Sequence, residues 1–256
     1  MRLLLAGCEY SGTTTLAHAI AKWAKRVLGT DWMAHDHGKT PHISGHGDDW
    51  APDRGFLRPL NDEDWPHPKH PDRPITALSD EEERAFLSLS PRVKEFISRL
   101  SLHYHTPAVR EASSNGGVIG HHIDDAVYGP LYFGYGGPDE PNGKARTVYS
   151  RIVERQMVEF SPQDVLVLVK ASPEVIARRM KENPHRIGVV KEKDIEYVLR
   201  RFQEEYERSI IHDRFTLDTS TATVDETVAE FATKIESYLS DEERGRILTR
   251  SNLFGD

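Results

Sequence analysis

Residues 7–15, near the start of the chain, carry the clearest chemical pattern and read Gly-Cys-Glu-Tyr-Ser-Gly-Thr-Thr-Thr. The pattern G-x-x-x-x-G-K-[ST] is typical of phosphate-binding loops, whose glycines let backbone N–H groups approach a phosphate and whose lysine adds a positive charge. Gly7, Gly12 and Thr14 match this pattern, whereas Thr13 stands at the lysine position. The sequence therefore predicts a phosphate-binding loop that lacks its own cation.

The surroundings of this loop strengthen the prediction. A short apolar strand precedes it and a helical pattern follows, so the first N–H groups and the dipole of that helix would face a bound phosphate. The alternative is a strand–turn–helix junction whose glycines have no ligand, and the position of the loop favours phosphate binding. The predicted ligand-binding residues are Gly7, Tyr10, Ser11, Gly12, Thr13, Thr14 and Thr15, with the Thr14 hydroxyl as a Mg²⁺ ligand.

Strands and helices alternate along the chain that must position this loop. Such alternation predicts an α/β fold of three layers, with a doubly wound, parallel five-stranded sheet whose ligands bind beyond the carboxyl ends of the strands. Apolar runs and helical periodicity place strands at 3–6, 32–34, 118–120, 165–169 and 215–217, and helices at 13–28, 91–104, 124–133, 146–160, 173–181, 191–211 and 224–239, with a further short helix after Pro107.

Length and composition restrict the class of protein. The 256 residues suffice for one sizeable core, and the net charge of −8 disfavours a nucleic-acid-binding protein. Cys8 is the single cysteine, and no run approaches the roughly 20 apolar residues that span a membrane. We expect a cytoplasmic domain over 1–239, with an irregular insertion at 37–76 and a polar, partly helical tail at 240–256. The sequence leaves a homodimer open.

Three segments resemble the thymidylate-kinase-like and uridine-kinase-like groups of P-loop kinases. Ser11-Gly12-x-Thr14-Thr15 is similar to their phosphate loop, and 164–179, with Pro173-Glu174 and Arg179, is similar to their fourth strand and the start of their lid. Residues 217–220 resemble their last strand, and the three segments occur in the expected order. The resemblance implies a P-loop kinase that uses ATP and Mg²⁺ to phosphorylate a small hydroxyl- or phosphate-bearing acceptor, such as a nucleoside or nucleotide.

The same resemblance implies a lid at 178–190. Arg178, Arg179 and Arg186 would close over the phosphates and stabilise negative charge on the transferring phosphoryl group. Arginines on a helix usually form a solvated face, but their place after the 165–169 strand favours the lid.

The absent lysine leaves the activity open. A charge pair at ~4 Å contributes on the order of 4 kcal/mol near a protein surface, so its loss needs a replacement. Candidate cations are Arg178, Arg179, Arg186, Lys170 and Lys144. Without such a replacement, the chain would be a catalytically silent pseudokinase that binds a nucleotide or another anion.

Carboxylates and histidines are the candidates for the acceptor side. The resembling kinases place an acidic base after the second strand, so Asp36 is the first choice for the residue that activates the acceptor hydroxyl, and Glu9 the second. Where these kinases often carry an acid and an arginine after the third strand, this chain has Gly120-His121-His122. The predicted acceptor-binding residues are His121, His122, Asp125 and Tyr128. The 13 histidines show no zinc-binding spacing, so we interpret them as polar or substrate-facing groups.

Overall fold

The computed structural model describes residues 1–32, 34–36, 80–106, 116–137, 145–185 and 188–254. Within these residues five strands form one sheet in the order β2-β3-β1-β4-β5, and every neighbouring pair is parallel. The strands are β1 (Arg2–Ala6), β2 (Ala34–Asp36), β3 (Gly116–Ile119), β4 (Asp164–Lys170) and β5 (Arg214–Asp218). The predicted α/β class with a parallel sheet is confirmed.

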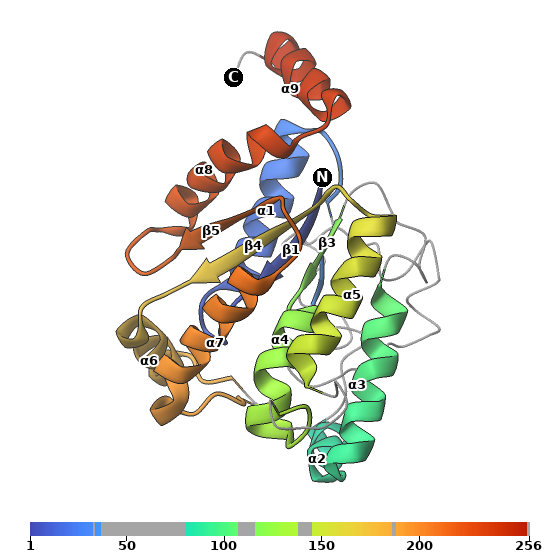
Figure 1. Ribbon diagram of the computed structural model, residues 1–256. Helices are drawn as coiled ribbons and strands as arrows, with labels where there is room; N and C mark the ends of the chain where they lie inside the picture. The colour runs from blue at the N-terminus through green and yellow to red at the C-terminus, as the bar shows by residue number, and fades with distance from the viewer. Residues whose placement is uncertain (33, 37–79, 107–115, 138–144, 186–187, 255–256) are drawn as a thin grey trace.

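Helices cover both faces of this sheet (Figure 1). Helices α1 and α8 lie on one face, and α4, α5 and α7 lie on the other. The helices are α1 (Thr13–Val27), α2 (Asp80–Ser88), α3 (Pro91–His105), α4 (His121–Tyr128), α5 (Arg146–Phe160), α6 (Pro173–Glu182), α7 (Ile195–Arg208), α8 (Val224–Ile235) and α9 (Asp241–Phe254).

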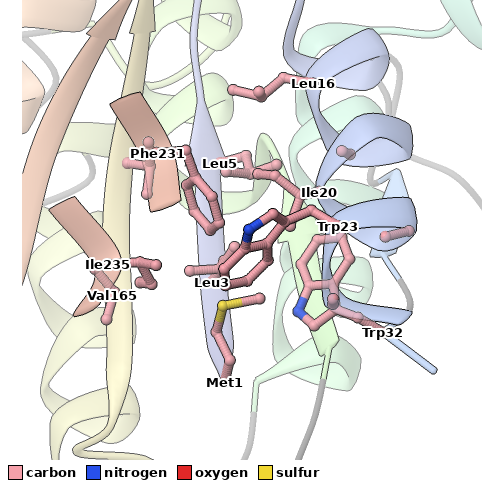
Figure 2. Close-up of a cluster of buried hydrophobic side chains, with 14 of the residues drawn as sticks. Met1, Leu3, Leu5, Leu16, Ile20, Trp23, Trp32, Val165, Phe231 and Ile235 are labelled. Atoms are coloured by element: carbon pink, nitrogen blue, oxygen red, sulfur yellow. The ribbon is translucent and has the colours of Figure 1, made fainter. Parts of the chain in front are cut away.

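The period-two alternation of the strands explains why two apolar cores form. Leu3 and Leu5 of β1 pack against Trp23 of α1 and Phe231 of α8, as Figure 2 shows. Leu4 belongs to the opposite core, with side chains of α4 and α7. A central parallel strand is buried on both faces, and this accounts for the uninterrupted apolar sequences of β1 and β4.

Several element boundaries differ from prediction. Strand β2 lies at Ala34–Asp36 rather than 32–34, and the helix predicted at 191–211 is a short 3-10 turn followed by α7. The helix predicted at 124–133 begins at His121 and loosens into a π-turn at Gly129–Phe133. Pro130 lacks the N–H that an α-helix needs at this point, which explains the change of hydrogen-bond pattern. The 37–76 insertion and the helix predicted after Pro107 lie outside the described residues.

The polar tail, predicted to be partly helical, is a helix over most of its length. Ser240 and Glu243 cap the start of α9 reciprocally, since each backbone N–H donates to the side chain of the other residue. Glu243 also pairs with the amino group of Met1, and Arg250 donates to the carbonyl of Arg26 at 3.0 Å. These contacts attach α9 to the main domain. None of the described helices has the length and apolar character needed to span a membrane.

Candidate functional site

The loop between β1 and α1 is a tight turn with two glycines, Gly7 and Gly12, and each position requires glycine for a different steric reason. Gly12 has a φ of +96°, a left-handed conformation that glycine adopts without strain. At Gly7, an added Cβ would stand 2.5 Å from the carbonyl oxygen of Val169 and 2.6 Å from Ser11 Oγ. The loop therefore passes so close to β4 that residue 7 has no space for a side chain.

The turn leads directly into the first turn of α1. Ser11 N–H donates to the Cys8 carbonyl at 2.8 Å, and the Gly12 carbonyl accepts from Leu16 N–H at 2.9 Å. Gly12 occupies the N-cap position and has no side chain with which to cap the helix. A helix N-terminus after a glycine turn attracts anions through its N–H groups and its dipole.

Glu9 of the loop holds part of the predicted lid. Its carboxylate is buried and accepts from Val189 N–H at 3.0 Å and from Val190 N–H at 2.9 Å. His185 Nδ1 lies 2.7 Å from Glu9 Oε1. The carboxylate predicted as the second-choice base is therefore directed at the lid in this structure.

Tyr10 adds a second connection between loop and lid. Its ring stacks on His185 with centroids 4.1 Å apart, and its hydroxyl oxygen accepts from His185 N–H at 3.0 Å. Tyr10 has a φ of +68°, an uncommon conformation for a residue other than glycine. Such a residue is held in place by its surroundings, here the ring stacking and hydrogen bond.

Arg179 reaches the loop from α6. One of its terminal nitrogens lies 3.0 Å from both the Tyr10 carbonyl and Thr219 Oγ1, and the other donates to the Thr219 carbonyl at 2.8 Å. Thr219 in turn donates to the Ser11 carbonyl at 2.8 Å. Burial, together with the neighbouring charge of Arg178, lowers the pKa of Arg179. Of the other predicted lid arginines, Arg178 makes no hydrogen bond or ion pair within the described residues, and Arg186 lies outside them.

The four predicted acceptor-binding residues lie together on α4 but are engaged in packing. The Nδ1 atoms of His121 and His122 are 3.0 Å apart, and His121 Nε2 lies 3.3 Å from the Leu102 carbonyl. Tyr128 is buried, which raises the pKa of its hydroxyl, and this hydroxyl accepts from the Glu9 N–H at 2.9 Å. Asp125 accepts from Tyr135 at 2.9 Å and pairs with Ser98 and Arg146.

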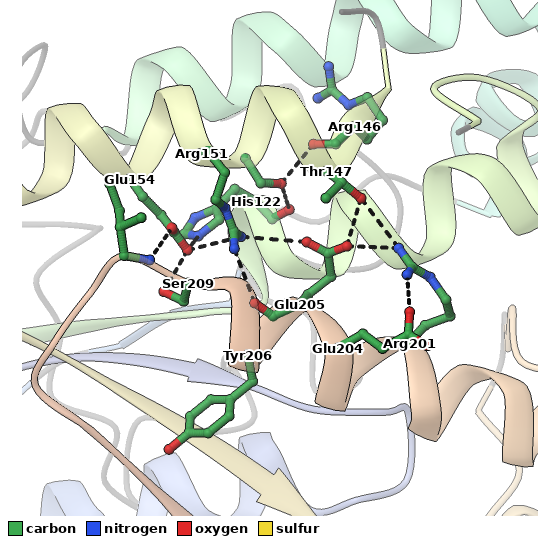
Figure 3. A network of polar contacts seen from close by, with 12 residues as sticks. His122, Arg146, Thr147, Arg151, Glu154, Arg201, Glu204, Glu205, Tyr206 and Ser209 are labelled. Carbon is green, nitrogen blue, oxygen red and sulfur yellow. Dashed lines mark hydrogen bonds and ion pairs between the residues drawn. The ribbon is translucent and has the colours of Figure 1, made fainter. Parts of the chain in front are cut away.

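His122 belongs to a buried polar network between α4, α5 and α7 (Figure 3). Its Nε2 lies 3.0 Å from Glu154 Oε1, and both side chains are fully buried. Glu154 also accepts from the Ser209 hydroxyl at 2.8 Å and pairs with Arg151 at 3.1 Å. This arrangement gives His122 a structural role in the observed conformation.

Arg146 is a residue that the sequence interpretation missed. It is fully buried, its Nε pairs with Asp125, and its guanidinium carbon lies 4.2 Å from the centroid of the Tyr149 ring. Within the described residues both terminal nitrogens lack a hydrogen-bond partner, and Figure 3 shows this guanidinium directed away from the network around Glu154. Buried donors without an acceptor are rare and require an explanation. A single arginine at a helix start gives no signal of this in the sequence.

Asp36, the residue predicted as the base after the second strand, is the last residue of β2. It is paired in register with Ile119 of β3. Its side chain lies outside the described part of the chain. Among the residues that the structure does describe, no cluster of three or more histidine, cysteine, aspartate or glutamate side chains is arranged to hold a metal ion.

No protein-family model matches the sequence, and no curated protein matches it either. Solved structures match the fold. Deoxyadenosine kinase from M. mycoides with bound dCTP aligns with 93% of this chain and 100% of its own, at a TM-score of 0.51 and 13% identity. The structure of the same enzyme with bound dATP aligns with 91% of this chain and 98% of its own, at a TM-score of 0.51 and 12% identity. The chain thus has a fold similar to that of a nucleoside kinase, and identities this low show the fold alone.

Proposed function

We propose that this chain is an ATP- and Mg²⁺-dependent phosphotransferase of the P-loop type, acting on a small hydroxyl- or phosphate-bearing acceptor such as a nucleoside or nucleotide. The observation that carries the proposal is the glycine turn at residues 7–12. This turn contacts β4 closely at Gly7 and is followed directly by the N-terminus of α1. The fold shared with deoxyadenosine kinase supports it.

In this proposal the loop binds the phosphates through its backbone. The N–H groups of the loop and of the first turn of α1 surround the β-phosphate, and Arg178 and Arg186 close over the γ-phosphate, while Arg179 holds the loop. Thr14, on the exposed first turn of α1, would hold Mg²⁺ together with phosphate oxygens and water. Mg²⁺ supplies charge neutralisation between the phosphates when it is bound.

Asp36 is our proposed base for the acceptor, because it ends β2 at the carboxyl edge of the sheet. For Glu9 we propose a positioning role, since its carboxylate is already bonded to the lid backbone and to His185. His121, His122 and Tyr128 would then shape the acceptor site from α4 rather than contact the reacting atoms.

The acceptor is proposed to bind beside Arg146, between α3 and α5. Asp125 pairs with Arg146 Nε, and the Glu95 carboxylate lies 4.0 Å from Nη1, so the guanidinium charge is already compensated. A neutral group with hydrogen-bond acceptors therefore suits the two terminal nitrogens, which have no hydrogen-bond partner in the described residues, better than an anion does. We expect Arg146→Met to raise the KM for the acceptor about tenfold and to change kcat less, because two hydrogen bonds to the ground state are lost. Steady-state kinetics at saturating ATP measures this.

Arg99→Met is the matched control for this experiment. Arg99 also lies over the Tyr149 ring, at 4.4 Å, but it already has an acceptor in Glu95 at 2.6 Å. A KM that rises equally in both variants would show that Arg146 acts through packing, against the proposal.

Arg179 is proposed to hold the loop in its binding conformation. Arg179→Lys keeps the positive charge but cannot make all three hydrogen bonds to Tyr10 and Thr219. We expect the Kd for ATP to rise about 10- to 100-fold, as isothermal titration calorimetry would show. Lys181→Ala is the control, because Lys181 lies on the same helix and pairs with Glu192 at the surface. An unchanged Kd in Arg179→Lys would refute this role.

One experiment separates the proposed kinase from a silent binder. Thermal unfolding is followed with ATP, ADP and Mg²⁺, and ADP release is then measured against a panel of nucleosides and nucleotides. Stabilisation together with ADP release supports the kinase. Thr13 in place of the loop lysine favours the alternative of a pseudokinase, which predicts stabilisation without turnover on any acceptor. No stabilisation by any nucleotide would contradict both.

We further propose a cytoplasmic homodimer with no nucleic-acid or membrane partner. Apolar side chains are exposed along α3 and α5: Val93, Phe96, Leu100, Val148 and Ile152. Phe96 is 62% exposed and Leu100 is 54% exposed, so a second copy would remove substantial apolar surface from water. Sedimentation equilibrium measures the oligomeric state directly.

A further inference from the structure

Two segments of the chain approach Gly7 closely. The position of a Gly7 Cβ is 2.5 Å from the carbonyl oxygen of Val169 and 3.1 Å from the Cγ2 atom of Thr13. The side chain at the lysine position of the motif and the end of β4 are therefore close neighbours. The residue that follows Val169 is Lys170.

The backbone of Lys170 is fixed relative to the loop. Its carbonyl accepts from the Thr219 N–H at 2.8 Å, and the Thr219 hydroxyl donates to the Ser11 carbonyl at 2.8 Å. Thr219 thus links the last residue of β4 to the phosphate loop. A lysine that starts from this point has a flexible four-carbon stem with which to reach a phosphate bound in the loop.

The alternation of β4 gives the direction of the Lys170 side chain. Leu166 and Leu168 face the core that contains Val190 from the lid segment and Ile176 of α6, and Lys170 follows on the same face of the strand. The side chain is exposed, and within the described residues its ammonium group has no hydrogen bond or ion pair. Lys170 thus lies at the carboxyl edge of the sheet, on the face against which the lid residue Val190 also packs.

The other described cations near the loop are less suitable. The terminal nitrogens of Arg179 already donate to Tyr10 and Thr219, so its guanidinium serves the loop backbone. Arg178 has no hydrogen-bond or ion-pair partner within the described ranges, but it starts from helix α6 rather than from the strand that contacts Gly7. Lys170 is therefore a cation that directly follows the residue in contact with Gly7 and whose charge is not already used by the loop backbone.

We propose that Lys170 supplies the positive charge that the loop lacks at Thr13, by binding the β- and γ-phosphates of ATP from the end of β4. This inference rests on the proposed function and deepens it, since it assigns the phosphate-binding cation of that same site. It also gives a reason why Thr13 is tolerated in a working loop.

A rescue experiment tests the assignment. The Kd values for Mg·ATP and for AMP are measured calorimetrically for the native chain, Lys170→Met, Thr13→Lys and the double variant. We expect Lys170→Met to weaken ATP binding at least tenfold and to change AMP binding less than twofold, because AMP has no β- or γ-phosphate. Thr13→Lys should restore ATP binding to the Lys170→Met variant and add little to the native chain.

Control variants separate the possible failures. Lys181→Met removes an exposed cation of α6 and should leave the Kd for ATP unchanged. If Lys170→Met bound ATP as the native chain does, the Lys170 assignment would be overturned and the proposed function would stand. The same conclusion would follow if Arg178→Met lost ATP affinity and Thr13→Lys restored it in the double variant. A native chain that does not bind ATP at all would overturn the proposed function as well. Thermal unfolding of each variant shows whether it remains folded.

Discussion

Replacing Gly7 with alanine is expected to eliminate ATP binding and to lower the free energy of unfolding by about 1–3 kcal/mol. The added Cβ would meet the Val169 carbonyl at 2.5 Å, and that carbonyl belongs to a central strand with neighbours on both sides. Ser11 Oγ, at 2.6 Å, can rotate away, but the strand backbone cannot. The loop must therefore move from β4, which displaces the N–H groups proposed to bind phosphate. Urea unfolding and calorimetric titration with ATP measure the two effects.

Gly245→Ala is the matched control. Gly245 lies within α9, and an added Cβ there meets no atom within 4 Å. Alanine is the better helix former, so this variant should gain up to about 1 kcal/mol and bind ATP normally. If Gly7→Ala were as stable as the native chain and still bound ATP, the close contact between loop and β4 would not exist in solution.

Local sequence signals were sufficient for the parts of the fold that are regular and apolar. Strand β4 and the α1 periodicity were recognisable because a buried parallel strand and an amphipathic helix have distinct patterns. The cap of α9 is a further local signal, formed by Ser240 and Glu243, which stand three residues apart. This cap gives the helical part of the predicted tail a defined start.

The candidate site was predictable only where backbone geometry demands particular residues. Glycine is required at residue 7 because the loop approaches β4 closely, and at residue 12 because φ is positive. The partners of Glu9, in contrast, are some 180 residues away in the sequence. A pair of histidines gives no signal that distinguishes a substrate-facing side chain from a buried one. For His122 the difference is made by Glu154, which α5 brings against it. Such pairings depend on the packing of helices and not on local sequence.

The buried network around Glu154 should have the largest effect on stability. We expect Glu154→Gln to lower the free energy of unfolding by about 3–5 kcal/mol at neutral pH, because Arg151 and His122 lose the buried carboxylate that they contact. The amide keeps the size of the side chain, so a cavity does not contribute. Glu230→Gln is the control, since its surface pair with Lys234 on α8 contributes at most about 0.5 kcal/mol.

The pH dependence of this difference provides the stricter test. Burial raises the pKa of Glu154, but the hydrogen bond and charge of His122, with the charge of Arg151, outweigh it and hold the pKa below its usual value. The folded chain thus binds this proton less readily than the unfolded chain does. The stabilisation is complete above the unfolded pKa of about 4.3 and is lost as the pH falls through that value towards the folded pKa. Urea unfolding should therefore show the native chain and Glu154→Gln converging below about pH 4, whereas a constant difference would mean that packing, not charge, stabilises this network.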